Sequence, residues 1–247
     1  MAYYEYKESP FAIRQDLVDA YREYWQALSM PGNWFSGAER VAVAAEVRHA
    51  LDCPFCAQRK QALSPYTMEG EHLAGEILPD RIVDAVHRVV TDQSRITPAW
   101  IEDNAAHGLG EEQYAELVGI VVAVFSIDEF NRALGLAPEP LPEPLPGEPD
   151  HYRPAQAQPG NGFLQMLPAE GATGAEADLW PAGSNSNVLR ALSLVPDAVR
   201  SWKSISNAQY LPFREILQFG GDTGRALNRM QIELVAGRVS SINECFY

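Results

Sequence analysis

The sequence is poor in cysteine and in positive charge. It has three cysteines in 247 residues, and 19 Lys and Arg stand against 33 Asp and Glu, which gives a net charge of −14. Nucleic-acid phosphates and anionic membrane surfaces recruit proteins that are rich in Lys and Arg. The charge balance therefore excludes both as expected partners.

Long apolar runs are also lacking. The longest, at residues 117–125, is far shorter than the roughly 20 residues that span a bilayer. The N-terminus lacks the basic start and apolar core of a signal peptide. We therefore expect a cytoplasmic protein with no membrane partner. In that compartment three cysteines do not predict a disulfide framework, so a close cysteine pair indicates a catalytic, redox-sensing or metal-binding role.

No alternating strand pattern is present, and nearly every ordered stretch has helical periodicity. We predict an all-α fold. The composition changes at Ala137, where a proline-rich and then glycine-rich stretch begins. The predicted organisation is an N-terminal helical domain at residues 1–136, a linker at 137–186 and a second, incomplete helical repeat at 187–247.

Two short motifs carry the chemistry. The first is Cys53-Pro-Phe-Cys56, which stands at a predicted helix start. Backbone N–H groups there favour a thiolate, and the spacing lets one sulfur form a disulfide with the other after oxidation. The second motif is Glu233-x11-Cys245, with two residues after the cysteine. This spacing suggests that a second C-x-x-C is cut short.

The two halves look like divergent repeats. When Cys53 is set on Cys245, residues Val43-Ala44 align with Val235-Ala236, and Val47 aligns with Val239. These are apolar positions of the helix that leads into each cysteine.

Two other interpretations of the first cysteine pair stay open. A lone C-x-x-C is half of a zinc site, and the histidines available to complete it are His49, His72 and His87. Of these, His87 borders the apolar stripe of its helix and is better explained as a structural histidine. The cysteine pair could also be inert and buried.

The helix that leads into Cys53-Pro-Phe-Cys56, the all-α repeats and the Glu-x11-Cys spacing resemble the alkylhydroperoxidase AhpD-like, carboxymuconolactone decarboxylase-like superfamily. The resemblance covers residues 36–136 and 187–247. It implies an AhpD-like helical bundle of two repeats. The family motif E-x11-C-x-x-C-x3-H implies that Cys56 attacks the peroxide, that Cys53 resolves the sulfenic acid, and that a glutamate and a histidine relay protons.

The first half departs from this motif at two positions. Lys60 stands at the histidine position and Val41 at the glutamate position. Arg48 and Lys60 could instead favour a thiolate by their positive charge. The candidate substitutes for the missing relay are Glu46, Glu69 and, as the preferred one, His72.

These observations predict a thiol-dependent peroxidase or disulfide oxidoreductase, an alkylhydroperoxidase that reduces hydroperoxides and is regenerated by an external dithiol. The protein is expected to form a homo-oligomer and to need no cofactor or metal. The predicted catalytic residues are Cys53, Cys56, Glu233, Cys245 and His72. One alternative is a non-catalytic helical scaffold that assembles oligomers. A carboxymuconolactone decarboxylase-type lyase is a weaker alternative, because the family's lactone enzymes do not depend on a C-x-x-C.

Overall fold

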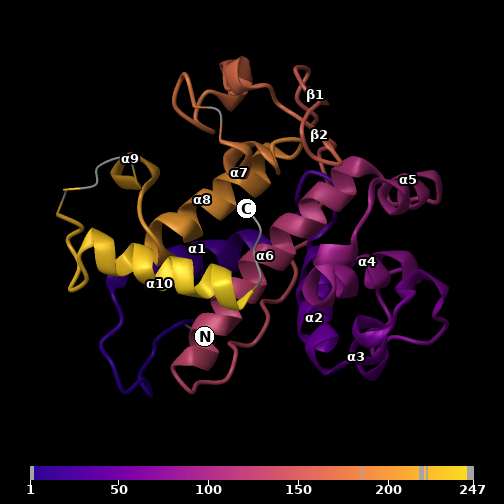
Figure 1. The fold of residues 1–247 in the computed structure, drawn as a ribbon, viewed down its shortest axis with the longest axis horizontal. Helices are drawn as coiled ribbons and strands as arrows, with labels where there is room; N and C mark the ends of the chain where they lie inside the picture. The colour runs from indigo at the N-terminus through magenta and orange to yellow at the C-terminus, as the bar shows by residue number, and fades with distance from the viewer. Residues whose placement is uncertain (1–2, 185, 217–219, 221, 244–247) are drawn as a thin grey trace.

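The computed structural model describes residues 3–184, 186–216, 220 and 222–243. Its architecture is all-α, as the sequence predicts (Figure 1). The strands in the described part are one antiparallel pair of two residues each, β1 (Gln158–Pro159) and β2 (Gln165–Met166).

Six α-helices make up the first half of the chain. They are α1 (Gln15–Ser29), α2 (Gly37–Asp52), α3 (Pro54–Gln61), α4 (Asp80–Thr91), α5 (Pro98–Ala106) and α6 (Glu111–Ala133), with the short 3-10 helices η1 (Pro65–Thr67) and η2 (Gln93–Arg95) between them. The long helix α6 lies at the centre and packs against α2, α4 and the later helix α8 (Pro196–Gln209) (Figure 1). In the described residues, no helix has both the length and the apolar character needed to cross a membrane.

The helix that leads to the cysteines begins at a capping box. The Ser36 hydroxyl accepts a hydrogen bond from the Glu39 N–H at 3.3 Å, and the Glu39 carboxylate accepts one from the Ser36 N–H at 2.8 Å. These contacts satisfy two N–H groups that a helix start leaves free. Val43, Ala44 and Val47 are fully buried between α1, α4 and α6. The sequence pattern places the same residues in the core.

The proline-rich segment predicted as a linker lies against the N-terminal helices. The Trp25 indole N–H donates to the Pro140 carbonyl at 2.9 Å, and the Leu145 N–H donates to the Ser29 carbonyl at 2.7 Å. Further along, η3 (Ala169–Gly171) and η4 (Gly174–Glu176) belong to a region with its own small apolar cluster. The domain boundaries themselves stay a prediction.

The second half contains α7 (Asn187–Arg190), α8 (Pro196–Gln209), α9 (Phe213–Ile216) and α10 (Arg229–Ile242). Glu233 lies on α10, where it accepts a hydrogen bond from the Tyr210 hydroxyl and pairs with Arg229 at 2.5 Å. Cys245 lies outside the described residues. The assignment of this half as a second repeat stays a prediction.

One buried ion pair joins α2 to α6. Arg40 Nη1 lies 2.6 Å from Glu116 Oε1, and the second oxygen of Glu116 accepts the Trp34 N–H at 2.6 Å. Gly32 lies close against this pair: a Cβ at Gly32 would lie 1.9 Å from Glu116 Oε1, so the ion pair would have to shift to make room for it. Burial raises the pKa of Glu116, although Arg40 and the backbone N–H groups oppose the shift.

Candidate functional site

The two cysteines lie where α2 ends and α3 begins. Cys53 is both the residue after α2 and the N-cap of α3, and Pro54 occupies the first helical position, where its missing N–H is not needed. Cys56 follows in the first turn. Both thiols are free and nearly inaccessible, with exposures of 2% for Cys53 and 1% for Cys56.

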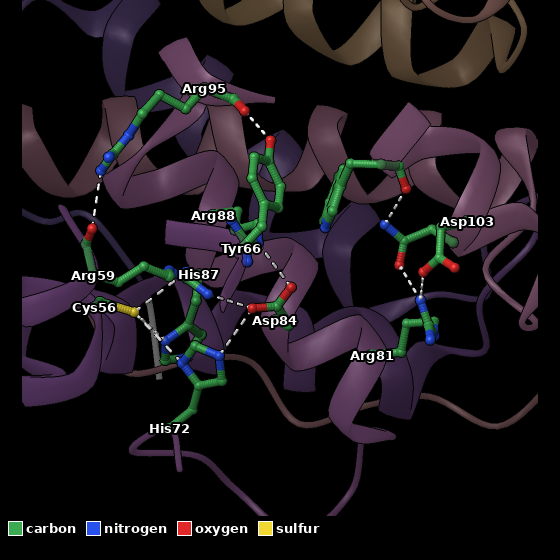
Figure 2. Close-up of polar contacts among 12 residues, drawn as sticks. Cys56, Arg59, Tyr66, His72, Arg81, Asp84, His87, Arg88, Arg95 and Asp103 are labelled. Atoms are coloured by element: carbon green, nitrogen blue, oxygen red, sulfur yellow. Dashed lines mark hydrogen bonds and ion pairs between the residues drawn. The ribbon is translucent and has the colours of Figure 1, made fainter. Parts of the chain in front are cut away.

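Three nitrogen-bearing side chains surround the Cys56 sulfur. His87 Nδ1 lies 3.2 Å from Cys56 Sγ, His72 Nδ1 lies 3.5 Å from it, and Arg59 Nη2 lies 3.7 Å from it (Figure 2). The first two are imidazoles whose rings meet edge to face at a centroid distance of 4.4 Å. A thiolate at Cys56 would thus be held by hydrogen bonds and by the Arg59 charge.

His87 is oriented by a buried carboxylate. Its Nε2 lies 3.1 Å from Glu46 Oε2, and both side chains are almost completely buried. The other oxygen of Glu46 accepts the Gly75 N–H at 2.7 Å and contacts His49 Nδ1 at 3.2 Å. Because a carboxylate accepts hydrogen bonds, it places the ring proton on Nε2 of His87. The Nδ1 lone pair of the neutral ring is then directed at Cys56.

His72 reaches the sulfurs from the irregular segment 62–79 that joins α3 to α4. The segment approaches Phe55 so closely that a Cβ at Gly70 would lie 2.4 Å from the Phe55 ring. The His72 ring packs edge to face on the same ring, and the Leu73 N–H donates to Cys53 Sγ at 3.4 Å. His72 Nδ1 lies 3.8 Å from Cys53 Sγ. The segment therefore supplies two donors to the cysteine pair.

Asp84 on α4 connects the two histidine-bearing parts of the site. Its Oδ1 accepts from His72 Nε2 at 3.1 Å and from Arg59, and its Oδ2 accepts from Arg88 Nε at 2.9 Å (Figure 2). Burial alone would raise the pKa of Asp84, but His72 and the two guanidinium groups hold that pKa well below its usual range. The carboxylate is thus ionised and holds His72 in place.

The hydrogen bonds around Cys53 and His72 favour a negative charge on the Cys53 sulfur and a positive charge on the His72 ring. Burial opposes the thiolate at Cys53, yet the Leu73 and Cys56 N–H groups and His72 lower its pKa to about 7. Burial likewise opposes the imidazolium at His72, yet Asp84 and the two sulfurs raise its pKa to about 10. Burial lowers the pKa of His87 despite Glu46. Near neutral pH the site therefore combines a charged His72 with a neutral His87.

A largely apolar cavity of about 750 Å³ reaches the cysteines. Cys53 and Cys56 lie in its wall together with Lys60. The apolar part of the lining comes from α2, α4 and α6 and includes Leu51, Val89, Val90, Val121, Val122 and Phe125. The cavity therefore brings a largely apolar space up to the two cysteines.

Arg95 closes the C-terminal end of α3. Its guanidinium donates to the carbonyls of Arg59, Lys60 and Ala62 at 3.0, 2.8 and 2.7 Å, and Asp92 holds it at 2.7 Å. A helix end leaves such carbonyls without partners.

We expect Arg95→Ala to lower the free energy of unfolding by about 1–3 kcal/mol, since charged hydrogen bonds to the end of α3 are lost. Hydrogen exchange should accelerate in α3 more than in α6. Arg95→Lys keeps the charge but not the fork of donors, so it should recover part of the loss. Wild-type stability in Arg95→Ala would contradict this role.

The structure brings together three of the predicted site residues, Cys53, Cys56 and His72. The predicted Glu233 does not contact them, because it pairs with Tyr210 and Arg229 on another face. Cys245, also predicted, lies outside the described residues.

The structure corrects one of the two positive charges, Arg48 and Lys60, that the sequence analysis placed near the thiols. Arg48 is held away by Asp128, with bonds of 2.8 and 3.0 Å, and by the Glu139 carbonyl. Arg59 contacts Cys56 instead. Lys60 lies in the wall of the cavity.

The sequence interpretation missed the roles of Arg59 and Asp84 and treated His87 as structural. One signal was available. Glu46 and His87 are polar residues within otherwise apolar helix faces, and two such residues on adjacent helices indicate a buried pair.

Models of known protein families, curated protein sequences and solved structures gave no match to this chain.

Proposed function

We propose that this protein is a thiol oxidoreductase that reduces hydroperoxides through Cys56 and Cys53. The observation that carries the proposal is the contact series Glu46–His87–Cys56, with distances of 3.1 and 3.2 Å. A nucleophile, a base within hydrogen-bond reach and a carboxylate that orients the base form the arrangement that activates cysteine in catalysis. The family motif implies a proton relay of a glutamate and a histidine, but Val41 and Lys60 stand at those two positions. Glu46 and His87 would take the place of this relay.

The reaction follows from these positions. His87 Nδ1 accepts the Cys56 proton, and the thiolate attacks one peroxide oxygen, so that an S–O bond forms while the O–O bond breaks. The departing alkoxide takes back the proton from the His87 imidazolium and leaves as an alcohol. The Cys53 thiolate then attacks the Cys56 sulfur, so that the S–S bond forms while the S–O bond breaks; the departing hydroxide takes a proton from the His72 imidazolium and leaves as water. An external dithiol reduces this disulfide by exchange.

The apolar lining of the cavity favours hydroperoxides with an apolar body over hydrogen peroxide. Burial of such a body would supply binding free energy at about 25 cal/mol per Å² of apolar surface. The peroxide group would then lie at the end of the cavity that Cys53 and Cys56 line.

The test uses reduced protein from which metal has been removed by a chelator. After one equivalent of cumene hydroperoxide, the peptide carrying Cys53 and Cys56 should lose two hydrogens in mass spectrometry. In Cys53→Ser, dimedone should trap a sulfenic acid on Cys56. In Cys56→Ser, a sulfenic acid should form on Cys53 much more slowly than it forms on Cys56 in Cys53→Ser.

Two results would overturn the proposal. One is survival of both free thiols in excess hydroperoxide, which would favour the non-catalytic scaffold. The other is a sulfenic acid that forms on Cys53 and not on Cys56, which would reverse the two roles. Turnover with a dithiol reductant then distinguishes a catalyst from a protein that is oxidised only once.

A further inference from the structure

We infer that the reduced protein binds one zinc ion through Cys53, Cys56, His72 and His87. Zinc binding is independent of the proposed redox function and concerns a different state of the site, because two metal-bound thiolates are not free to attack a peroxide. It rests on the geometry of four ligand atoms that come from the start of α3, the segment 62–79 and α4.

The spacing of the four atoms fits a tetrahedral ion. One ligand atom from each residue lies within 4.8 Å of all the others. Zinc–sulfur and zinc–nitrogen bonds of about 2.3 and 2.0 Å separate tetrahedral ligands by roughly 3.3–3.8 Å. His72 Nδ1 lies 3.8 and 3.5 Å from the sulfurs of Cys53 and Cys56, and His87 Nδ1 lies 3.2 Å from that of Cys56. Small movements of side chains would complete the site.

Both histidines are held as metal ligands usually are. A ligating imidazole commonly donates its other N–H to a carboxylate, which fixes the tautomer and the ring orientation. Here His72 Nε2 contacts Asp84 and His87 Nε2 contacts Glu46, each at 3.1 Å. In both rings Nδ1 is the atom left to face the sulfurs. Two independent carboxylate–histidine pairs directed at one cysteine pair are a stronger indication than the C-x-x-C spacing.

The charge and burial of the cluster favour zinc among common ions. Two thiolates neutralise a divalent cation, so the buried centre carries no net charge of its own. Sulfur and imidazole ligands in a tetrahedron select zinc over magnesium or calcium, which prefer oxygen. Four protein ligands leave no open coordination position, so the site would be structural. It would pin the segment 62–79 to α3 and α4.

His49 provides the matched control. It was one of the three histidines that the sequence offered as zinc ligands, but its Nδ1 contacts Glu46 at 3.2 Å and it is not part of the four-residue cluster. His49→Asn should therefore keep zinc binding, whereas His72→Asn and Cys53→Ser each remove a ligand.

The experiment loads the chelator-treated, reduced chain with Zn²⁺ and measures the bound metal after gel filtration. We expect one equivalent in the wild type and in His49→Asn, and an affinity at least tenfold weaker in His72→Asn and Cys53→Ser. X-ray absorption should show two sulfur and two nitrogen neighbours. Co²⁺ in place of zinc should give the intense visible bands of a tetrahedral site. Circular dichroism checks that each variant keeps its helices.

Three outcomes would overturn the inference. They are the absence of tight zinc binding in the reduced wild type, binding that His72→Asn and Cys53→Ser leave unchanged, and a metal environment of oxygen and nitrogen alone. None of these decides the redox proposal, whose test uses metal-free protein and a different readout.

Discussion

In metal-free protein, His87→Gln should slow the oxidation of Cys56 by hydroperoxide by about 10²–10⁴-fold, the usual contribution of a general base. His87 Nδ1 is the acceptor that Glu46 directs at the sulfur. The rate constant is measured by quenching with an alkylating reagent and counting the remaining Cys56 thiol by mass spectrometry. A Cys53→Ser background keeps the reaction at the sulfenic acid.

Two further variants separate catalysis from packing. His49→Gln changes another imidazole that contacts Glu46 but touches no sulfur, so the oxidation rate should stay close to that of the wild type. Glu46→Gln keeps an oxygen that can accept the His87 N–H but removes the negative charge. Its oxidation rate should therefore fall between those of the wild type and His87→Gln. If His87→Gln folds normally and Cys56 is oxidised at the wild-type rate, His87 is not the base.

The second large effect concerns stability. Glu116→Ala should lower the free energy of unfolding by about 3–5 kcal/mol, since it leaves the buried Arg40 charge without an ionic partner. It also removes the acceptor of the Trp34 N–H. Urea unfolding followed by circular dichroism measures the change.

The control for Glu116→Ala is Glu129→Ala on the same helix. Glu129 pairs with Arg132 at the surface, and an exposed pair contributes little. The double variant Arg40→Met/Glu116→Leu should recover much of the lost stability, because apolar side chains can replace a buried ion pair. A small loss in Glu116→Ala would show that Arg40 finds water or another partner.

Local sequence signals predicted the helices around the site well. The Ser36 capping box fixes the start of α2, and Pro54 fixes the start of α3, because both act over one helical turn. His72, the preferred substitute base, lies beside both cysteines, but its charge near neutral pH leaves the role of base to His87 in the proposed reaction. These features depend on residues that lie close together in the chain or on a short connection.

The rest of the site depends on how the helices pack. His87 is 31 residues from Cys56 and 41 from Glu46, so their contacts exist only after α4 has packed against α2 and α3. Helical periodicity shows which face of α4 is buried but not which residue of α2 it meets. For this reason the sequence interpretation treated His87 as structural and did not find Asp84.

The segment 62–79 supplies part of the chemistry of the cysteines from outside the packed helices. It brings the His72 ring, the Leu73 N–H and the Gly75 N–H to the site, while α2, α4 and α6 pack through side chains of their own. Changes in the length of the part before Leu78, which belongs to the core, would therefore alter thiol acidity and ligand geometry together while α2, α4 and α6 stay packed. Reactivity can in this way diverge between related chains whose cysteine motifs are identical.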